Sequence, residues 1–570
     1  MLSLPALLAL TFSGTFASPF AAPKSALLML ASGILAALLL TRSTAWRLAR
    51  EEHGFWMAVA AYGVVTAISA VFSPRRELCL QGVELLACGV LLLVASRLVL
   101  GGADSARNTR DLQIAIATAA TLVALVTLVQ FFVTHRWWLF GLYAGRMRMC
   151  ATLGNPDFVA TLLAASIPTA IGLTIAAPSG CWRVASITSA LLIVIAILLT
   201  GSRGGVLVLT ACLAVLALSA RRRQRTRLLL AVVVVCSLAA ICDLNSRTVS
   251  ESLRGRVFIW QVSLGDGATR SVLGSGPGTF SYEYPSRLGR FFAEPGRARL
   301  LHFASNERHA ENDFVEAWQE TGWLGLAALL AMFGAWFALA VRRLNECSDA
   351  TRSAVVVSIA SVFALCAASL VDFPQHRAET WALQWILMAI PMACSTPVPA
   401  QSSTAVPVQS ARSLPAIWFR LRWIRYVLAA LLLVVGVGAA FSPLASSYEV
   451  AKGEVEESRE QMEPSLAAYR AALRWQPSSP DANFDLVRAQ AKTGDYTGAL
   501  TQSAIAVRYV NEPELYLMRS RILQNAGRDS DAVGVLDAAV RLFPYSAELR
   551  DEADSYSLPA SLPKVETENP

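Results

Sequence analysis

Charged residues are scarce in this sequence, and several motifs that often carry function are missing. Lys, Arg, Asp and Glu make up 16% of the 570 residues, whereas soluble domains contain about 25%. The ten cysteines form no C-x-x-C pair and show no metal-ligand spacing, so no metal site is predicted from them. No basic stripe is interleaved with aromatic residues, and nucleic acid is therefore not expected as a partner.

Long apolar runs are what the sequence has in place of charge. A run of roughly 20 mainly apolar residues spans a bilayer, and only helices satisfy their backbone groups there in a single pass. The sequence therefore predicts an all-α, polytopic membrane helix bundle of about 12–13 spans. The first run is interpreted as a retained span, since no Lys or Arg precedes Lys24. The runs are about 4–19, 25–41, 55–73, 80–99, 112–134, 153–176, 184–200, 204–220, 228–243, 315–341, 353–371, 379–395 and 426–445.

The net charge of +8 is interpreted as a sign of membrane topology. Basic loops mark the cytoplasmic side of membrane proteins. The loop RRRQRTR at 221–227 is the most basic, and Arg342, Arg343 and Arg352 mark another. Alternation from these loops puts 135–152, 201–203, 244–312, 372–378 and the chain after 446 on the outer side. A multi-pass membrane protein is expected, with its C-terminal part on the outer side of the membrane.

Composition divides the chain into five parts. Residues 396–425 begin as a Pro/Ser/Ala-rich linker without periodicity. An outer loop of about seventy residues is long for a structureless connection and is predicted to be functional. The parts are a membrane bundle at 1–395 with the outer loop at 244–312, the linker at 396–425, a last transmembrane helix at 426–445, soluble helical repeats at 446–555 and a disordered tail at 556–570.

The repeats show a period near 33–34 residues. Gly494, Ala499 and Ala506 recur as Gly527, Ala532 and Ala539. This period resembles a tetratricopeptide array of about three units, which stacks helical hairpins and usually binds a protein partner on its concave face. The alternative is a helical spacer without a partner.

One acidic segment stands directly before an apolar helix. The stretch HAENDFVEAWQETGWLG at 309–325 contains His309, Glu311, Asp313, Glu316 and Glu320. Ionisable groups at a membrane boundary are costly unless they have a function, so this cluster is a candidate site. The alternative is an acidic first turn that the helix dipole favours.

Arginines on the predicted outer side form a second candidate set, because positive charge there is contrary to the usual topology. Arg146 and Arg148 precede a Gly-Asn-Pro turn, Arg203 lies in the hairpin SRGG, and Arg256 lies in the outer loop. A guanidinium suits phosphate oxygens. Taken one at a time, these residues are also compatible with interfacial or loop-surface charges. The segment 372–381, with His376, is either part of the same site or an interfacial anchor.

These motifs, in this order, resemble the O-antigen ligase-like (Wzy C-terminal) superfamily over roughly residues 140–395. The resemblance rests on SRGG at 202–205, Arg256-x-x-x-Trp260, GSGPGTF at 274–280, the segment ending Glu320-Thr-Gly, and VDFP at 371–374. It implies a GT-C-like fold. It also implies transfer of a glycan from an undecaprenyl diphosphate carrier on the outer face of the inner membrane, by an inverting reaction without metal or cofactor.

The resemblance also implies roles for individual residues. Family members usually read His-Asn-Asp where this chain has Glu311, Asn312 and Asp313, so either Glu311 or His309 would be the catalytic base. A carboxylate could act as base if burial raised its pKa. Asp313 and Asn312 would orient the base or the sugar. Arg203 and Arg256, with Arg146 or Arg148, would clamp the lipid diphosphate, and His376 is predicted to bind substrate.

Three acceptors fit this chemistry: lipid A-core for a ligase, the growing glycan for a polymerase, and a protein hydroxyl for an oligosaccharyltransferase. The repeat tail favours a protein partner or an assembly role. An envelope scaffold or a transporter is the non-enzymatic alternative. The two halves show no internal symmetry of the kind that many transporters have.

Overall fold

The computed structural model describes residues 3–41, 50–101, 104–133, 149–176, 180–219, 247–265, 272–394 and 422–556. All regular secondary structure in these residues is helical, which confirms an all-α protein. Nine of the helices described are long and apolar enough to cross a membrane, so the chain is a multi-pass membrane protein. They are α2 (Ala21–Thr41), α3 (His53–Phe72), α4 (Arg76–Leu100), α5 (Ser105–Val133), α6 (Pro156–Ala176), α7 (Cys181–Thr200), α12 (Asp313–Glu346), α13 (Asp349–Ala368) and α16 (Arg422–Ser458).

The prediction of a first membrane span at about 4–19 was wrong. The helix α1 covers only Leu4–Leu10 and is followed by turns. The Thr11 hydroxyl donates a hydrogen bond to the carbonyl of Leu7, and the Ser13 amide donates to the carbonyl of Pro19. Polar and turn-forming residues therefore end the helix early, although the run is apolar on average. The predicted span at 228–243 lies outside the described residues.

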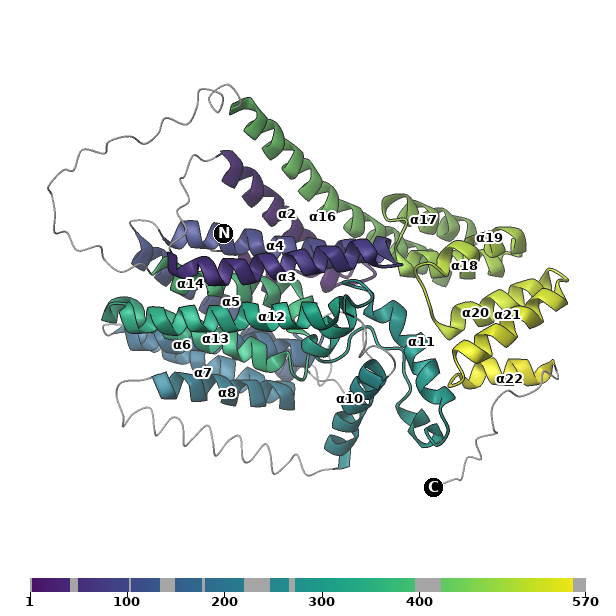
Figure 1. The fold of residues 1–570 in the computed structure, drawn as a ribbon, viewed down its shortest axis with the longest axis horizontal. Helices are drawn as coiled ribbons and strands as arrows, with labels where there is room; N and C mark the ends of the chain where they lie inside the picture. Colours follow the sequence, from purple (N-terminus) through teal and green to yellow (C-terminus); the bar gives the residue numbers. More distant parts are fainter. Residues whose placement is uncertain are drawn as a thin grey trace.

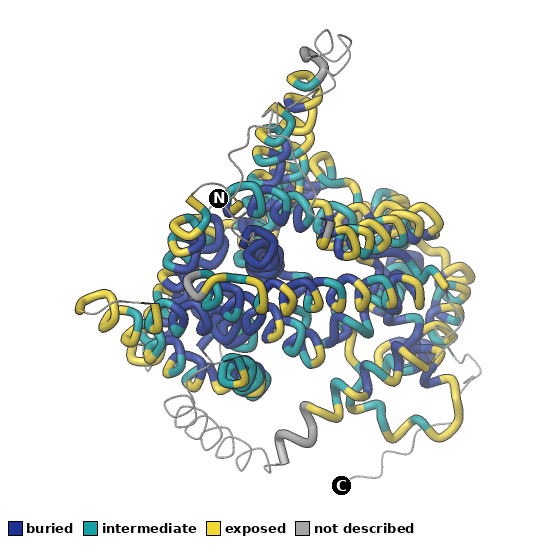
Figure 2. The backbone as a smooth tube through the Cα atoms, turned by 60° about the vertical axis from the view of Figure 1, so that its left-hand side comes forward, coloured by how far each residue is buried: buried dark blue, intermediate teal, exposed yellow. Residues whose placement is uncertain are grey.

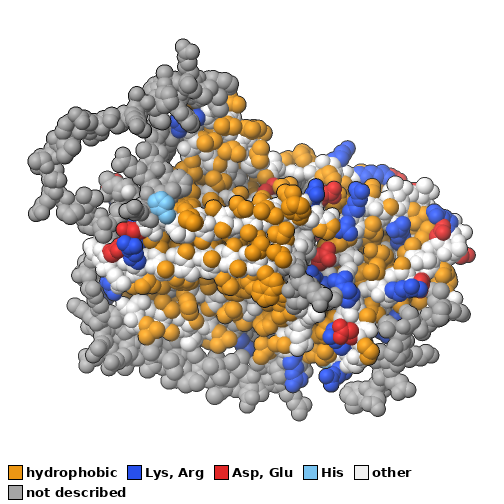
Figure 3. All heavy atoms as spheres, viewed as in Figure 1, with side chains coloured by type: hydrophobic (Ala, Val, Ile, Leu, Met, Phe, Trp, Pro, Cys, Tyr) orange, Lys and Arg blue, Asp and Glu red, His pale blue; other side chains and the backbone are white. Residues whose placement is uncertain are grey.

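The core of the bundle surrounds α14 (Ala378–Ala393), whose residues are all buried. Trp381 and Trp385 from this helix pack edge to face, and the Trp381 indole donates to the Leu85 carbonyl of α4. Gly89 of α4 leaves room for the Trp385 ring. Figure 2 shows the buried backbone concentrated in the middle of the bundle. Hydrophobic side chains cover the bundle face in Figure 3, as expected for a surface in contact with lipid.

The two ends of the bundle differ in the groups that lie there (Figure 1). At one end Arg343 and Arg342 of α12 pair with Glu51. At the other end, called the site end below, α12 begins, and α10 (Arg247–Gly265), α11 (Phe280–Ala293) and the 3-10 helix η3 (Ala298–Phe303) lie beside it. Buried aromatic side chains of α10 and α11 form a small separate core there, which includes Phe258, Tyr284 and Phe291.

The helices of the predicted repeats pack at the site end as well (Figure 1). Gly494 and Gly527, which the repeat pattern picked out, take positive φ angles of 79° and 71° in the turns between helices, where glycine is favoured. The helices are α17 (Met462–Trp475), α18 (Pro480–Lys492), α19 (Tyr496–Ala506), α20 (Pro513–Asn525), α21 (Asp529–Leu542) and α22 (Ala547–Ser555).

The helix α16 joins these repeats to the membrane part without interruption. It crosses α2 closely, because Gly33 and Gly436 face each other and a Cβ on Gly33 would meet the Gly436 Cα at 2.9 Å. Small residues at such crossings let two membrane helices approach. Beyond the crossing, the Ser442 hydroxyl donates to the Trp475 carbonyl of α17. The repeat helices are thus connected to the bundle by a continuous helix.

Candidate functional site

The start of α12 organises the site. Asn312 caps the helix, because its side-chain oxygen accepts from the amides of Phe314 at 3.0 Å and Val315 at 3.1 Å. Its amide nitrogen donates to the Leu370 carbonyl at 2.9 Å. Asn312 therefore fixes where α12 begins and ties this point to the end of α13. Contact of Asn312 with a substrate remains a prediction.

Asp313 is buried and ties α12 to the segment that contains His376. One carboxylate oxygen accepts from the Ser369 hydroxyl at 2.6 Å and from the Gln375 amide at 3.2 Å. The other lies 3.0 Å from Nδ1 of His376. Both carboxylate oxygens of Asp313 are thus bonded to groups of the protein, and one of these bonds positions His376.

Glu316 holds two histidines together. Its Oε1 lies 2.9 Å from Nδ1 of His309 and 3.3 Å from Nε2 of His376, and its Oε2 accepts from the Ala310 amide at 2.9 Å. The His309 ring stacks on Phe373 at 4.2 Å between centroids. Glu316 and Phe373 thus fix the orientation of His309.

These contacts determine the charge of the cluster. Burial disfavours a charged His376, but the attraction of Glu316 and Asp313 outweighs burial and raises the pKa of His376 to about 10. His376 is therefore a cation at neutral pH, with a proton on both ring nitrogens. It balances part of the carboxylate charge on α12.

A metal ion is the other way to balance such charge. His309, Glu316 and His376 offer two ring nitrogens and a carboxylate oxygen within 4.8 Å of one another, a donor set that suits zinc. Nε2 of His376 carries a proton in the hydrogen-bonded arrangement, and a cation would have to displace it. The spacing along the chain gave no sign of this group, because His376 comes from a different segment.

Glu311 has an unusual backbone and an unusual side-chain environment. Its φ angle is 52°, and such strained conformations in residues other than glycine are common at functional sites. Arg256 of α10 lies 3.5 Å from its carboxylate. Burial raises the pKa of Glu311 to about 7; Arg256 opposes this shift, and the charges of Asp372, Glu307 and Asp157 add to it. A carboxylate with this pKa is suited to proton transfer near neutral pH.

The predicted arginines have different positions. Arg256 reaches Glu311, while Arg203 is the first residue of α8 (Arg203–Ser219). A Cβ on the adjacent Gly204 would lie 3.8 Å from Val371, so Arg203 is at the site end beside the segment that leads to His376. Arg146 and Arg148 lie outside the described residues.

The sequence motifs assign no individual role to Glu316 or Glu320. Asp313, Glu316 and Glu320 are spaced i, i+3 and i+7 and so lie on one face of α12, which is the signal that was available. The Glu320 carboxylate accepts a hydrogen bond from the Phe280 amide at 3.0 Å, and the backbone carbonyl of Glu320 accepts one from the Gly276 amide at 2.8 Å. The glycine-rich run therefore packs on α12, where Gly322 has a φ of 70° and kinks the helix.

An apolar cavity of about 740 Å³ begins beside the site. Asn312 and Leu370 line it next to Glu311, Leu264 of α10 also lines it, and it continues between α12 and α13 past Trp323 to Leu330. The lining residues from Asn312 to Leu330 lie on both sides of the kink at Gly322. The lining is almost entirely apolar, with Asn312 at the end next to Glu311.

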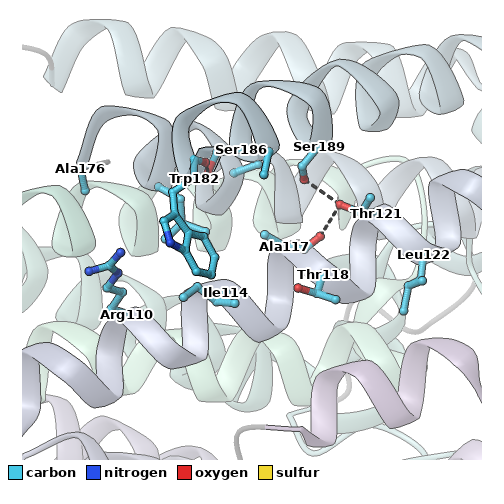
Figure 4. A pocket seen from close by; sticks show the side chains of 13 residues that line it. Arg110, Ile114, Ala117, Thr118, Thr121, Leu122, Ala176, Trp182, Ser186 and Ser189 are labelled. Carbon is cyan, nitrogen blue, oxygen red and sulfur yellow. Dashed lines mark hydrogen bonds between the residues drawn. The ribbon is translucent and has the colours of Figure 1, made fainter. Parts of the chain in front are cut away.

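A second cavity has different properties. It measures about 240 Å³ and lies between α5 and α7, where Thr121 and Ser189 share a hydrogen bond (Figure 4). Its lining contains Arg110 and Trp182, close to the end of the bundle where Arg97 pairs with Glu52. This cavity therefore belongs to the end opposite the site.

Comparison with known proteins supports the resemblance drawn from the motifs. Residues 188–330 match the family described as O-Antigen ligase. The matched segment includes Arg203, Arg256, His309, Glu311 and Glu320. No curated protein matches the chain. The O-antigen ligase family transfers glycans, and the match supports a role of this kind, as a ligase or polymerase of lipid-linked glycans in a membrane.

Proposed function

We propose that this protein transfers a glycan from an undecaprenyl diphosphate carrier to an acceptor hydroxyl on the outer face of the bacterial inner membrane. The observation that carries the proposal is the pair of Arg256 and Glu311 at 3.5 Å. It joins a guanidinium suited to phosphate with a carboxylate whose pKa is about 7. The family match over 188–330 supports the same class of reaction.

Glu311 acts as the base in the proposed reaction. It takes the proton of the acceptor hydroxyl while the oxygen attacks the anomeric carbon from the face opposite the leaving group, which inverts that centre. The bond between the anomeric carbon and the diphosphate oxygen breaks, and its electron pair leaves with the diphosphate. Arg256 releases Glu311 and binds a phosphate oxygen of the donor instead. Together with Arg203 it offsets the negative charge that develops on the leaving diphosphate.

His309 is the second candidate for the base, and a specific contact favours it. Glu316 lies 2.9 Å from Nδ1 of His309, and this arrangement leaves Nε2 to accept a proton, as in other carboxylate–histidine pairs. Asp313 and His376 position this pair. The proposed mechanism uses arginine side chains for the phosphate charge and needs no metal or cofactor.

The apolar cavity between α12 and α13 is proposed to hold the polyprenyl chain of the donor. Replacing Ala367, which lines the cavity, by Trp should fill it and raise the KM for the lipid-linked donor several-fold with little change in kcat. Ala331→Trp, on an exposed position of α12, is the matched control. Kinetics with donors of long and short polyprenyl chains would measure the effect; equal KM values for the two variants would contradict the assignment.

Reconstitution in proteoliposomes tests the function. Purified protein, a polyprenyl diphosphate-linked glycan and one of three acceptors (lipid A-core, free glycan or a protein rich in Ser and Thr) should give a glycosylated product with one of them. Loss of transfer in the Glu311→Gln variant, with the protein still in the membrane, would support the enzyme. If wild-type protein transferred no glycan to any of the three, a scaffold or transporter would become the better explanation.

A further inference from the structure

The repeat helices do not extend freely from the membrane part; they contact α11. Asn511, between α19 and α20, donates to the Tyr282 carbonyl at 2.8 Å and lies 2.7 Å from the Ser286 hydroxyl. The Tyr282 hydroxyl donates in return to the Val507 carbonyl at 2.9 Å. Asn511 is only 6% exposed, so this amide is part of a closed interface.

The same interface continues along α11 in close contact. A Cβ on Gly289 would lie 1.8 Å from the Leu542 carbonyl oxygen of α21, and no other residue would fit there without separating the two helices. Tyr545 packs against Phe292 with 6.1 Å between ring centroids. At the rim, Arg308 lies 3.5 Å from Asp481 of α18. The face of the repeats that meets α11 is therefore occupied by this chain itself.

A path of packed side chains leads from this interface to the site. Phe292 and Phe291 of α11 pack on Phe258 of α10, with ring centroids 5.9 Å and 5.4 Å away. Phe258 lies two residues after Arg256, and the buried cluster that contains it ends at Ala310, next to Glu311. The position of Arg256 relative to Glu311 thus depends on where α11 holds α10.

We propose that the repeat array is a positioning domain for the site, with Asn511 as its main positioning residue: it holds α11, and through α11 and α10 it holds Arg256 beside Glu311. The inference rests on the proposed function, since it assigns the array a role in that reaction. It gives the array an intramolecular partner, α11, in place of the separate protein that a repeat array would suggest.

The proposal predicts a change in pH dependence that a loss of stability alone would not produce. The charged groups that act on Glu311 are Arg256 on α10, Glu307 in the preceding loop, Asp372 after α13 and Asp157 on α6. Arg256 is the cation among them, and withdrawing it raises the pKa of Glu311. The rising limb of the pH profile of kcat/KM should therefore move to higher pH, by about 1 unit or more for an opposite charge at this distance.

The test uses full-length protein in proteoliposomes. Asn511→Ala removes the two contacts to α11, and Gly289→Ala forces the array away from α11. Gly534→Ala on α21 is the control, because a Cβ there meets nothing within 4 Å. Both test variants should move the rising part of the pH profile to higher pH. A shift of one unit from a pKa of about 7 lowers the deprotonated fraction of Glu311 at pH 7, and with it kcat/KM, by roughly fivefold. The control should match the wild type.

Hydrogen exchange of the amides in α10 and α11 provides a readout that does not need activity. Both test variants should lose protection there, whether or not the protein transfers glycan. The positioning role would be overturned if α10 and α11 lost protection in these variants while the rising part of the pH profile of kcat/KM stayed at the wild-type pH. Unchanged protection would overturn the docking itself. Absence of transfer by the wild type, with protection still dependent on Asn511, would instead count against the proposed function alone.

Discussion

Glu311→Gln is expected to lower kcat/KM by about 10²- to 10⁴-fold, the range usual for loss of a general base. The amide keeps the size of the side chain and cannot take a proton from the acceptor. In the wild type, kcat/KM should rise with pH through about 7, because burial raises the pKa of Glu311 to that value and only the deprotonated form acts as base. The variant should lack this rise.

His309→Gln is the matched comparison for that experiment. If Glu311 is the base, this variant should keep the rise near pH 7 and lose less activity, because His309 then serves mainly to bind Glu316. The reverse pattern, with the pH-dependent rise lost in His309→Gln and kept in Glu311→Gln, would assign the proton transfer to His309. Circular dichroism and membrane extraction would show that both variants fold.

Removing the guanidinium of Arg256 should have the second large effect. Arg256→Ala is expected to lower kcat by about 10²- to 10³-fold, the loss typical of a group that stabilises charge in the transition state. Arg256→Lys keeps the charge but not the planar pair of donors, so it should recover only part of the activity. Arg203→Ala is expected to act in the same direction.

Arg299→Ala is the control for the arginine series, because Arg299 lies in the same segment between α10 and α12 and is exposed. It should transfer glycan at the wild-type rate. Steady-state kinetics with a polyprenyl diphosphate-linked donor would separate kcat from KM for each variant. Full activity in both Arg203→Ala and Arg256→Ala would rule out the proposed phosphate contacts.

The sequence predicts most of the membrane fold, because apolar runs long enough to span a bilayer have few other structures available. The exceptions are local. The run at 4–19 meets the average hydropathy of a span, yet Thr11, Ser13 and Pro19 end its helix early. At 378–393 the helix is completely buried, and no periodicity separates an internal helix from one that faces lipid.

The candidate site could be predicted only in part. The spacing of Asp313 and Glu316 on α12 is a local property that the sequence contains. The contacts of His376 with both of them depend on packing between distant segments. The separation of Arg256 and Glu311 is likewise a result of how the aromatic cluster of α10 and α11 folds. The residue types can be recognised in the sequence, whereas the tertiary structure determines which of them come into contact.

The unbroken course of α16 connects the membrane part to the helices at the site end. A membrane helix that is too long for a thinner bilayer tilts to match it. Because α16 continues directly to the repeats, and Asn511 joins these to α11, a change of tilt would be passed on as a displacement of α11. A bilayer of different thickness is therefore expected to move α11 relative to the site, with no soluble effector involved.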